Sequence, residues 1–103
     1  MTLDIRQEIP IRSFSISAYI CRVSEGRSKY LVLRRASKYL RGTWQQVSRR
    51  IEDGETGWQA ALREILEETG LVPDRFYSAN WTQTFYEHKQ NCINVIPVFC
   101  WLR

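Results

Sequence analysis

One helical segment, residues 56–70, constrains the fold of this 103-residue chain more than any other feature. Thr56 and Gln59 stand three residues apart, as in the capping box that begins many helices. Gly70 can end the helix, and Pro73 follows soon after. The apolar or weakly polar positions recur at helical spacing, and they are Trp58, Ala61, Leu62, Ile65, Leu66 and Thr69. The sequence therefore predicts one amphipathic helix over residues 57–69.

The segments on both sides of this helix have the composition of β-strands. They alternate in polarity and are rich in β-branched and aromatic residues, at 14–23, 29–35, 75–87 and 91–103, with short extended pieces within 43–52. Residues 24–28 resemble a turn, which predicts a hairpin between the first two strands. Pro97 predicts an edge position, a bulge or a break in the last strand. The resulting order, β-β-β-α-β-β, is an α/β (α+β) layout with one helix beside a mixed or antiparallel sheet.

The length predicts a single domain, 1–103, and the composition narrows its surroundings. No apolar run approaches the roughly 20 residues that a membrane span needs, and the charged N-terminus lacks a signal peptide's apolar centre. Three cysteines without C-x-x-C spacing indicate reduced thiols, so we expect a cytoplasmic protein. A formal net charge of +4 favours a polyanionic partner, either a phosphate compound or nucleic acid.

Three glutamates, Glu64, Glu67 and Glu68, crowd one side of the predicted helix. Like charges three or four residues apart destabilise a helix, although Arg63 can pair with Glu67 at i+4. One interpretation is a solvated helix face. The other is a site for a hard dication, because Mg²⁺ prefers carboxylate oxygens and keeps positions free for water and substrate phosphates.

The stretch from Glu55 to Leu71, ETGWQAALREILEETGL, resembles the Nudix hydrolase signature. That signature is Gly, five residues, Glu, seven residues, then Arg-Glu-aliphatic-any-Glu-Glu-any-Gly-aliphatic, and eight of its nine specified positions match here. The resemblance implies a Nudix-type α/β/α sandwich with a mixed sheet. It also implies hydrolysis of a nucleoside diphosphate linked to another group, with Mg²⁺ or Mn²⁺ as cofactor.

The resemblance also implies roles for five side chains. Glu67 and Glu68 would be the principal metal ligands. Glu64 would be a further ligand or the base that activates water, so that Glu64, Glu67 and Arg63 form the catalytic set. Arg63 would orient a glutamate, foremost Glu55, and Glu55 would be a ligand or a support for one.

Position 49 departs from the signature, because Arg49 stands where the family has its first glycine. The family often adds a backbone carbonyl of this loop to the metal shell, which here would come from Ser48. An arginine is strained if the backbone needs positive φ, and it brings a cation beside a metal site. Impaired activity is the favoured interpretation. In the alternative, Arg49 swings outward or binds a substrate phosphate.

The second departure is length, because Nudix domains usually continue with another strand and a helix. Without these C-terminal elements we expect the apolar run from Val95 to Leu102 to be exposed. An exposed apolar strand invites a second chain. The sequence therefore predicts a homodimer or a strand-exchanged oligomer.

Several other residues are candidates for holding the substrate, beside Arg49. Arg34 and Arg50 can attract phosphates, while Tyr39 and Trp44, like Phe85 and Tyr86, can stack on a base but more often pack in a core or on a strand face. The leading hypothesis is a Mg²⁺-dependent pyrophosphohydrolase that acts on a nucleoside triphosphate or another nucleoside-diphosphate-linked compound. The alternative is an impaired Nudix domain that binds nucleotide or a partner without turnover. An RNA-binding module is least favoured, since three clustered glutamates repel phosphates.

Overall fold

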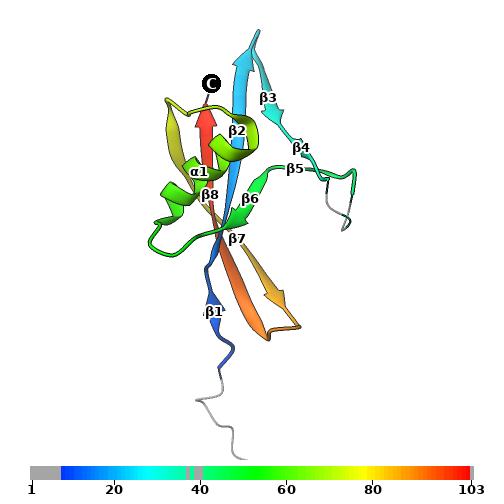
Figure 1. The fold of residues 1–103 in the computed structure, drawn as a ribbon, viewed down its shortest axis with the longest axis vertical. Helices are drawn as coiled ribbons and strands as arrows, with labels where there is room; N and C mark the ends of the chain where they lie inside the picture. Colours follow the sequence, from blue (N-terminus) through cyan, green and yellow to red (C-terminus); the bar gives the residue numbers. More distant parts are fainter. Residues whose placement is uncertain (1–7, 37, 39–40, 103) are drawn as a thin grey trace, which may run out of the picture.

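The computed structural model describes residues 8–36, 38 and 41–102 of the chain (Figure 1). These residues form eight strands and one helix. The elements are β1 (Ile11–Arg12), β2 (Ser15–Ser24), β3 (Arg27–Leu31), β4 (Leu33–Arg34), β5 (Trp44–Gln45), β6 (Val47–Arg50), α1 (Gly57–Thr69), β7 (Phe76–Glu87) and β8 (Cys92–Leu102). Within the described residues, no helix is both long and apolar enough to cross a membrane.

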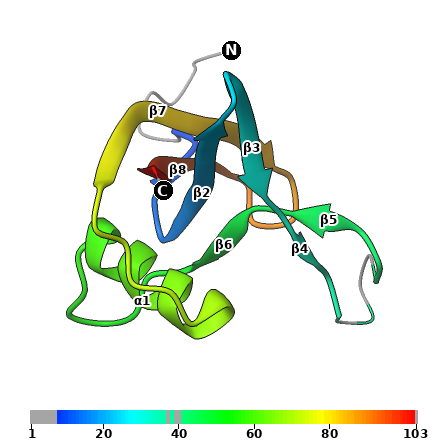
Figure 2. The same ribbon diagram turned by 90° about the horizontal axis from the view of Figure 1, so that it is seen from above.

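Strand β2 is the centre of a six-stranded mixed sheet. Its first half pairs with β6 and its second half with β3, both antiparallel, while β8 runs parallel to its middle. Strands β4 and β5 form a separate two-stranded sheet. The helix α1 packs beside this mixed sheet (Figure 2), so the predicted α/β class and the mixed sheet are confirmed.

The helix lies close to the sheet because small residues line its contact face. A Cβ atom added at Gly57 would lie only 3.7 Å from the side chains of Ile16 and Phe99. Ala60 and Ala61 are fully buried. With Ile65 they pack on the apolar core, which also contains Ile16, Ala18, Ile20, Val47 and Trp101.

The buried face of α1 differs from the predicted one. Trp58 and Leu66 are about half exposed, at 51% and 49%, whereas the charged Glu64 is buried at 6%. The alanines and Gly57 allow closer approach than the large side chains do, so the helix presents that side to the sheet. Its predicted bounds, 57–69, are confirmed.

Strand β8 is interior, which corrects the expectation that Val95 to Leu102 would be exposed. It pairs with β1, β2 and β7, and Val98 and Trp101 are buried. Pro97 does not mark an edge strand: it lies between the stretch of β8 that pairs with β1 and the stretch that pairs with β2. Because Pro97 pairs with neither β1 nor β2, its missing amide N–H removes no hydrogen bond to those strands.

The irregularity and the exposed rings occur on β7 instead. The register with β8 shifts between Ser78 and Trp81, where Asn80 has a φ of 52°. Beyond this bulge the β7–β8 hairpin extends away from the helix (Figure 1), and Trp81, Phe85 and Tyr86 are exposed. Phe85 and Tyr86 were expected to pack in the core or on a strand face; the core alternative is wrong, because no second layer covers this end of the hairpin in the described chain.

We predict that Ile65→Ala destabilises the protein by about 2–5 kcal/mol, because the side chain is fully buried between α1 and the sheet. Leu66→Ala is the matched control on the exposed side of the same helix and should cost much less. Urea unfolding followed by circular dichroism measures both. Equal losses in the two variants would contradict the observed orientation of the helix.

Acid stability should depend on Asp74, which follows α1 and accepts a hydrogen bond from the indole Nε1 of Trp101 at 3.2 Å. This hydrogen bond lowers the pKa of Asp74 from its ordinary value of 3.8. A carboxyl group with a lowered pKa stabilises the fold at pH values above its unfolded-state pKa. This stabilisation is lost as the pH falls through its folded-state pKa. The stability difference between the parent and Asp74→Asn should therefore shrink below pH 3.8, as thermal unfolding across pH would measure; a difference that is constant with pH contradicts this.

Candidate active site

Local backbone signals position the start and end of α1, and with them its acidic side chains. The Thr56 hydroxyl accepts a hydrogen bond from the Gln59 amide, and the Gln59 side chain accepts one from the Thr56 amide. Gly70 closes the helix in the left-handed conformation, φ 73°, and donates to the Leu66 carbonyl. The capping box satisfies amides that would otherwise lack partners, so the register of the glutamates along the helix is set locally.

The guanidinium of Arg63 joins four carboxylates. Its Nε donates to Glu55 Oε2 at 2.7 Å and its Nη2 to Glu55 Oε1 at 3.0 Å, which is a bidentate pair. Its Nη1 donates to Glu64 Oε1 at 2.6 Å and to Glu67 Oε2 at 3.3 Å, and it lies 3.4 Å from Glu52 Oε1. Arg63 therefore gathers acids from the helix and from the loop before it.

The loop before the helix is held in the same way. Arg63 Nη2 donates to the backbone carbonyl of Arg50 at 3.3 Å, and the Glu52 amide donates to Glu55 Oε1 at 2.9 Å. Arg63 lowers the pKa of Glu55, and Glu55 raises that of Arg63, so both side chains remain charged. The structure thus places Arg63 against Glu55, the contact expected of an orienting arginine.

Glu64 is a buried carboxylate between two guanidiniums. Its Oε1 accepts from Arg63, and its Oε2 lies 3.7 Å from Arg49 Nε. Burying a carboxylate costs free energy unless the carboxylate is paired with a cation and hydrogen-bonded. Glu64 has a hydrogen bond from Arg63 and an ion pair with Arg49. Glu67, by contrast, has a side chain 57% exposed, which makes it the helix acid most open to water.

Arg49 contacts the helix acids directly. Its Nη2 donates to Glu68 Oε1 at 3.0 Å and its Nε to the same oxygen at 3.3 Å, in addition to its ion pair with Glu64. Arg49 lies in β6 opposite Ile16, and the non-glycine residues with positive φ in the described chain are Glu25, Asn80 and Asn91. Position 49 therefore lacks the backbone strain that a positive φ would cause, because the chain forms a regular strand there.

Ser48 stands next to Arg49 in β6, opposite Ser17 of β2. Ser48, Arg49 and Glu68 line one recess of only about 10 Å³ between the strand and the helix. A cavity needs about 10–15 Å³ for a single water, so this recess has no room for a substrate group while Arg49 lies in it.

The acidic cluster has the donor atoms for the divalent cation that the signature implies. Carboxylate oxygens are the donors that Mg²⁺ prefers, and Glu64, Glu67 and Glu68 supply them. In the part of the chain that the structure describes, no three acidic, histidine or cysteine side chains converge as a ready-made cage. A guanidinium cation, that of Arg49, already lies against Glu64 and Glu68. The donors therefore fit a hard cation, at a position that Arg49 takes in this structure.

The other predicted substrate residues are dispersed. The Arg50 guanidinium lies 4.9 Å from the ring centre of Phe14, in a cleft that Arg12 and Gln90 also line. The Arg34 guanidinium lies 6.0 Å from the Trp44 ring on the β4–β5 pair. Trp44 is 64% exposed, so of its two expected packing roles, core and strand face, the core role is wrong.

Tyr39 falls outside the described residues.

Several contacts of the acidic cluster were not predicted from the sequence. Glu52 joins the Arg63 cluster, and its sequence signal is its place three residues before Glu55. The partners of Arg49 were also missed, because a strand residue and a helix residue 19 positions apart meet only in the folded chain.

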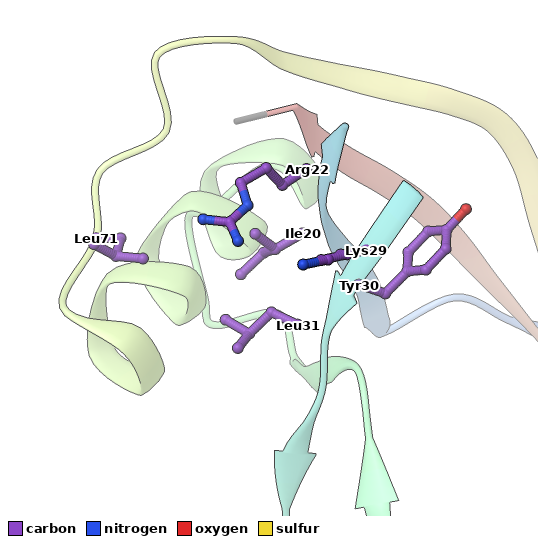
Figure 3. Close-up of a pocket in the computed structure, with 6 residues that line it drawn as sticks. All are labelled: Ile20, Arg22, Lys29, Tyr30, Leu31 and Leu71. Atoms are coloured by element: carbon purple, nitrogen blue, oxygen red, sulfur yellow. The ribbon is translucent and has the colours of Figure 1, made fainter. Parts of the chain in front are cut away.

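A separate pocket of about 250 Å³ lies beyond the C-terminal end of α1 (Figure 3). Its floor is apolar, and its rim carries Arg22 and Lys29, which are paired across β2 and β3. The ring of Tyr30 points away from the Arg22 side chain (Figure 3). The complete lining is Ile20, Arg22, Lys29, Tyr30, Leu31 and Leu71, none of which sequence reasoning singled out.

Curated relatives match part of this chain. A Caenorhabditis elegans protein with a nudix hydrolase name is 36% identical over 62 residues, which are 60% of this chain and 17% of that protein. An octanoyltransferase of Myxococcus xanthus is 45% identical over 62 residues, which are 60% of this chain and 16% of that protein. The chain thus matches about one sixth of the length of either relative.

Solved structures share the fold over almost the whole chain. The NUDIX domain of Shewanella oneidensis NrtR, complexed with ADP ribose, has a TM-score of 0.71 and 18% identity, covering 98% of this chain and 66% of that one. The E. coli dihydroneopterin triphosphate pyrophosphohydrolase has a TM-score of 0.69 and 25% identity, covering 93% and 71%. The family model described as NUDIX domain matches residues 14–99. The chain therefore belongs to the Nudix family.

Proposed function

We propose that this chain hydrolyses a pyrophosphate bond in a nucleoside triphosphate or another nucleoside-diphosphate-linked compound, with Mg²⁺ or Mn²⁺ as cofactor. The observation that carries the proposal is the Arg63 cluster, in which one guanidinium contacts Glu52, Glu55, Glu64 and Glu67. Membership of the Nudix family supports the reaction class. The likeness to a pyrophosphohydrolase at 25% identity agrees with it.

The acids differ in exposure and in their contacts with Arg49 and Arg63, which suggests different roles in the reaction. Glu64 and Glu68 would hold the cation, and Glu55 would support them through Arg63. A bound divalent cation polarises a phosphoryl oxygen and lowers the pKa of water. Ser48 would offer its backbone carbonyl to the same cation.

Glu67 is the best-placed general base in the reaction. Its side chain is exposed and has one contact with Arg63 at 3.3 Å, whereas both oxygens of Glu64 have partners. A water oxygen attacks phosphorus, its proton passes to the Glu67 carboxylate, and the P–O anhydride bond breaks to release the leaving phosphate. Arg63 is a positioning residue in this scheme, because its contacts are with acids.

Substrate phosphates would meet basic side chains on the strands β4 to β6. Arg49 and Arg50 lie on β6, and Arg34 with Trp44 lies on the β4–β5 pair. One solved relative is complexed with ADP ribose and another is named for dihydroneopterin triphosphate, so both compounds belong in a substrate panel with the nucleoside triphosphates.

The second candidate function is an impaired Nudix domain that binds nucleotide or a partner without turnover. The contact of Arg49 with Glu68 and Glu64 favours it, since the carboxylates are partly neutralised by the chain itself. Calorimetry that detects nucleotide binding, in a protein that releases no phosphate at high concentration, would select this function over the first.

We predict that Glu67→Gln lowers the rate of phosphate or pyrophosphate release by about 10²–10⁴-fold, because the amide cannot accept the proton from water. The assay is the substrate panel with Mg²⁺ or Mn²⁺, read by phosphate and pyrophosphate release. Glu25→Gln, a matched substitution in the β2–β3 turn, should keep the parent rate. Full activity in Glu67→Gln, or turnover unaffected by a chelator, would overturn the proposed mechanism.

We also propose that the chain associates with a second copy of itself, through β7. Trp81 and Phe85 are exposed and four residues apart, so they share one face of this strand. Replacing both with serine should reduce the oligomer fraction measured by light scattering after gel filtration, while Thr84→Ser, on the opposite face, should not. A parent protein that is monomeric at every concentration would refute this.

A further inference from the structure

We propose that Arg49 is an internal cation that competes with the divalent metal for Glu68 and Glu64. This inference rests on the proposed function, because it concerns the same acidic cluster. It assigns to Arg49 a role that the signature does not contain, since the signature has glycine at this position.

The contacts place the Arg49 guanidinium on the oxygens that a metal would need. It donates twice to Glu68 Oε1, at 3.0 and 3.3 Å, and lies 3.7 Å from Glu64 Oε2. An oxygen that accepts hydrogen bonds from a guanidinium has fewer lone pairs for a metal, and two cations at one position repel each other. Metal and guanidinium therefore compete at Glu68 Oε1.

The second guanidinium, that of Arg63, occupies other oxygens of the cluster. Glu55 has both oxygens on Arg63, and Glu64 Oε1 is 2.6 Å from the same guanidinium. Arg63 is only 21% exposed and bound to four acids, so it is held in place. Arg49, with a side chain 50% exposed, is the cation that is able to leave.

The charge of the cluster explains why a metal can still displace Arg49. Five carboxylates, those of Glu52, Glu55, Glu64, Glu67 and Glu68, face two guanidiniums, so a net charge of −3 remains. A dication reduces that excess by more than one guanidinium can. Arg49 would thus hold the acids together when metal is scarce and move toward solvent when metal binds.

Arg50 offers a matched control for this proposal. It follows Arg49 on β6, and its guanidinium lies over Phe14, 4.9 Å from the ring centre, instead of on the helix acids. Arg50→Gln removes the same charge from the same strand. Any general effect of net charge on metal affinity should therefore appear equally in Arg50→Gln and Arg49→Gln.

The test measures Mn²⁺ affinity without substrate, from the electron paramagnetic resonance signal of free Mn²⁺ during titration. Arg49→Gln should bind Mn²⁺ about 10-fold more tightly than the parent, a change that corresponds to losing one charge-assisted contact. Arg50→Gln should stay within about 3-fold of the parent, and Arg49→Lys should fall between the parent and Arg49→Gln. In the absence of metal, Arg49→Gln should have a lower Tm than Arg50→Gln, because Glu64 and Glu68 lose their counter-cation.

Each result is decisive, and the two proposals fail in different ways. Equal Mn²⁺ affinity in Arg49→Gln and Arg50→Gln overturns the competition, even if the parent hydrolyses nucleotides. Tighter binding in Arg49→Gln supports it, even if no variant hydrolyses any compound of the panel, in which case only the proposed function fails. If neither the parent nor Arg49→Gln binds Mn²⁺, the acids are not a metal site and the competition is refuted with it.

Discussion

The bidentate pair between Arg63 and Glu55 is the interaction on which the arrangement of the site depends. It joins the middle of α1 to the loop that connects the helix to β6, and the same guanidinium reaches the Arg50 carbonyl at the end of that strand. Charge-assisted bidentate pairs are geometrically specific as well as strong. The helix, the loop and the strand are therefore oriented about one point, and the acids of the signature face the same side.

This arrangement explains how a chain with a net charge of +4 presents an acidic site. The acids are concentrated around one guanidinium, whereas other arginines lie elsewhere, over Phe14 and over Trp44. Burial of Glu64 adds to the effect, because a carboxylate with little access to water interacts more strongly with any nearby cation. Local charge, and not the charge of the whole chain, determines which ion the site attracts.

The sequence predicts well the features that arise from neighbouring residues. The helix bounds are correct because the capping box and Gly70 act within a few residues. The burial of Glu64, the exposure of Trp58 and the interior position of β8 could not be predicted in the same way. They depend on how closely Gly57 and the two alanines let the helix approach the sheet, and on which strands pair across the fold. The acidic cluster was predicted from its spacing, but the partners of Arg49 depend on the register of β6 against β2.

That register gives position 49 its importance. Because Ile16 pairs with position 49 and belongs to the core beneath α1, the side chain at 49 also points to the helix side of the sheet. A glycine there would leave the carboxylates of the helix open to solvent and ions. An arginine there reaches them across the recess and contributes a positive charge of its own, with the backbone in an ordinary strand conformation. One strand residue, outside the helix that carries the acids, therefore neutralises part of their charge.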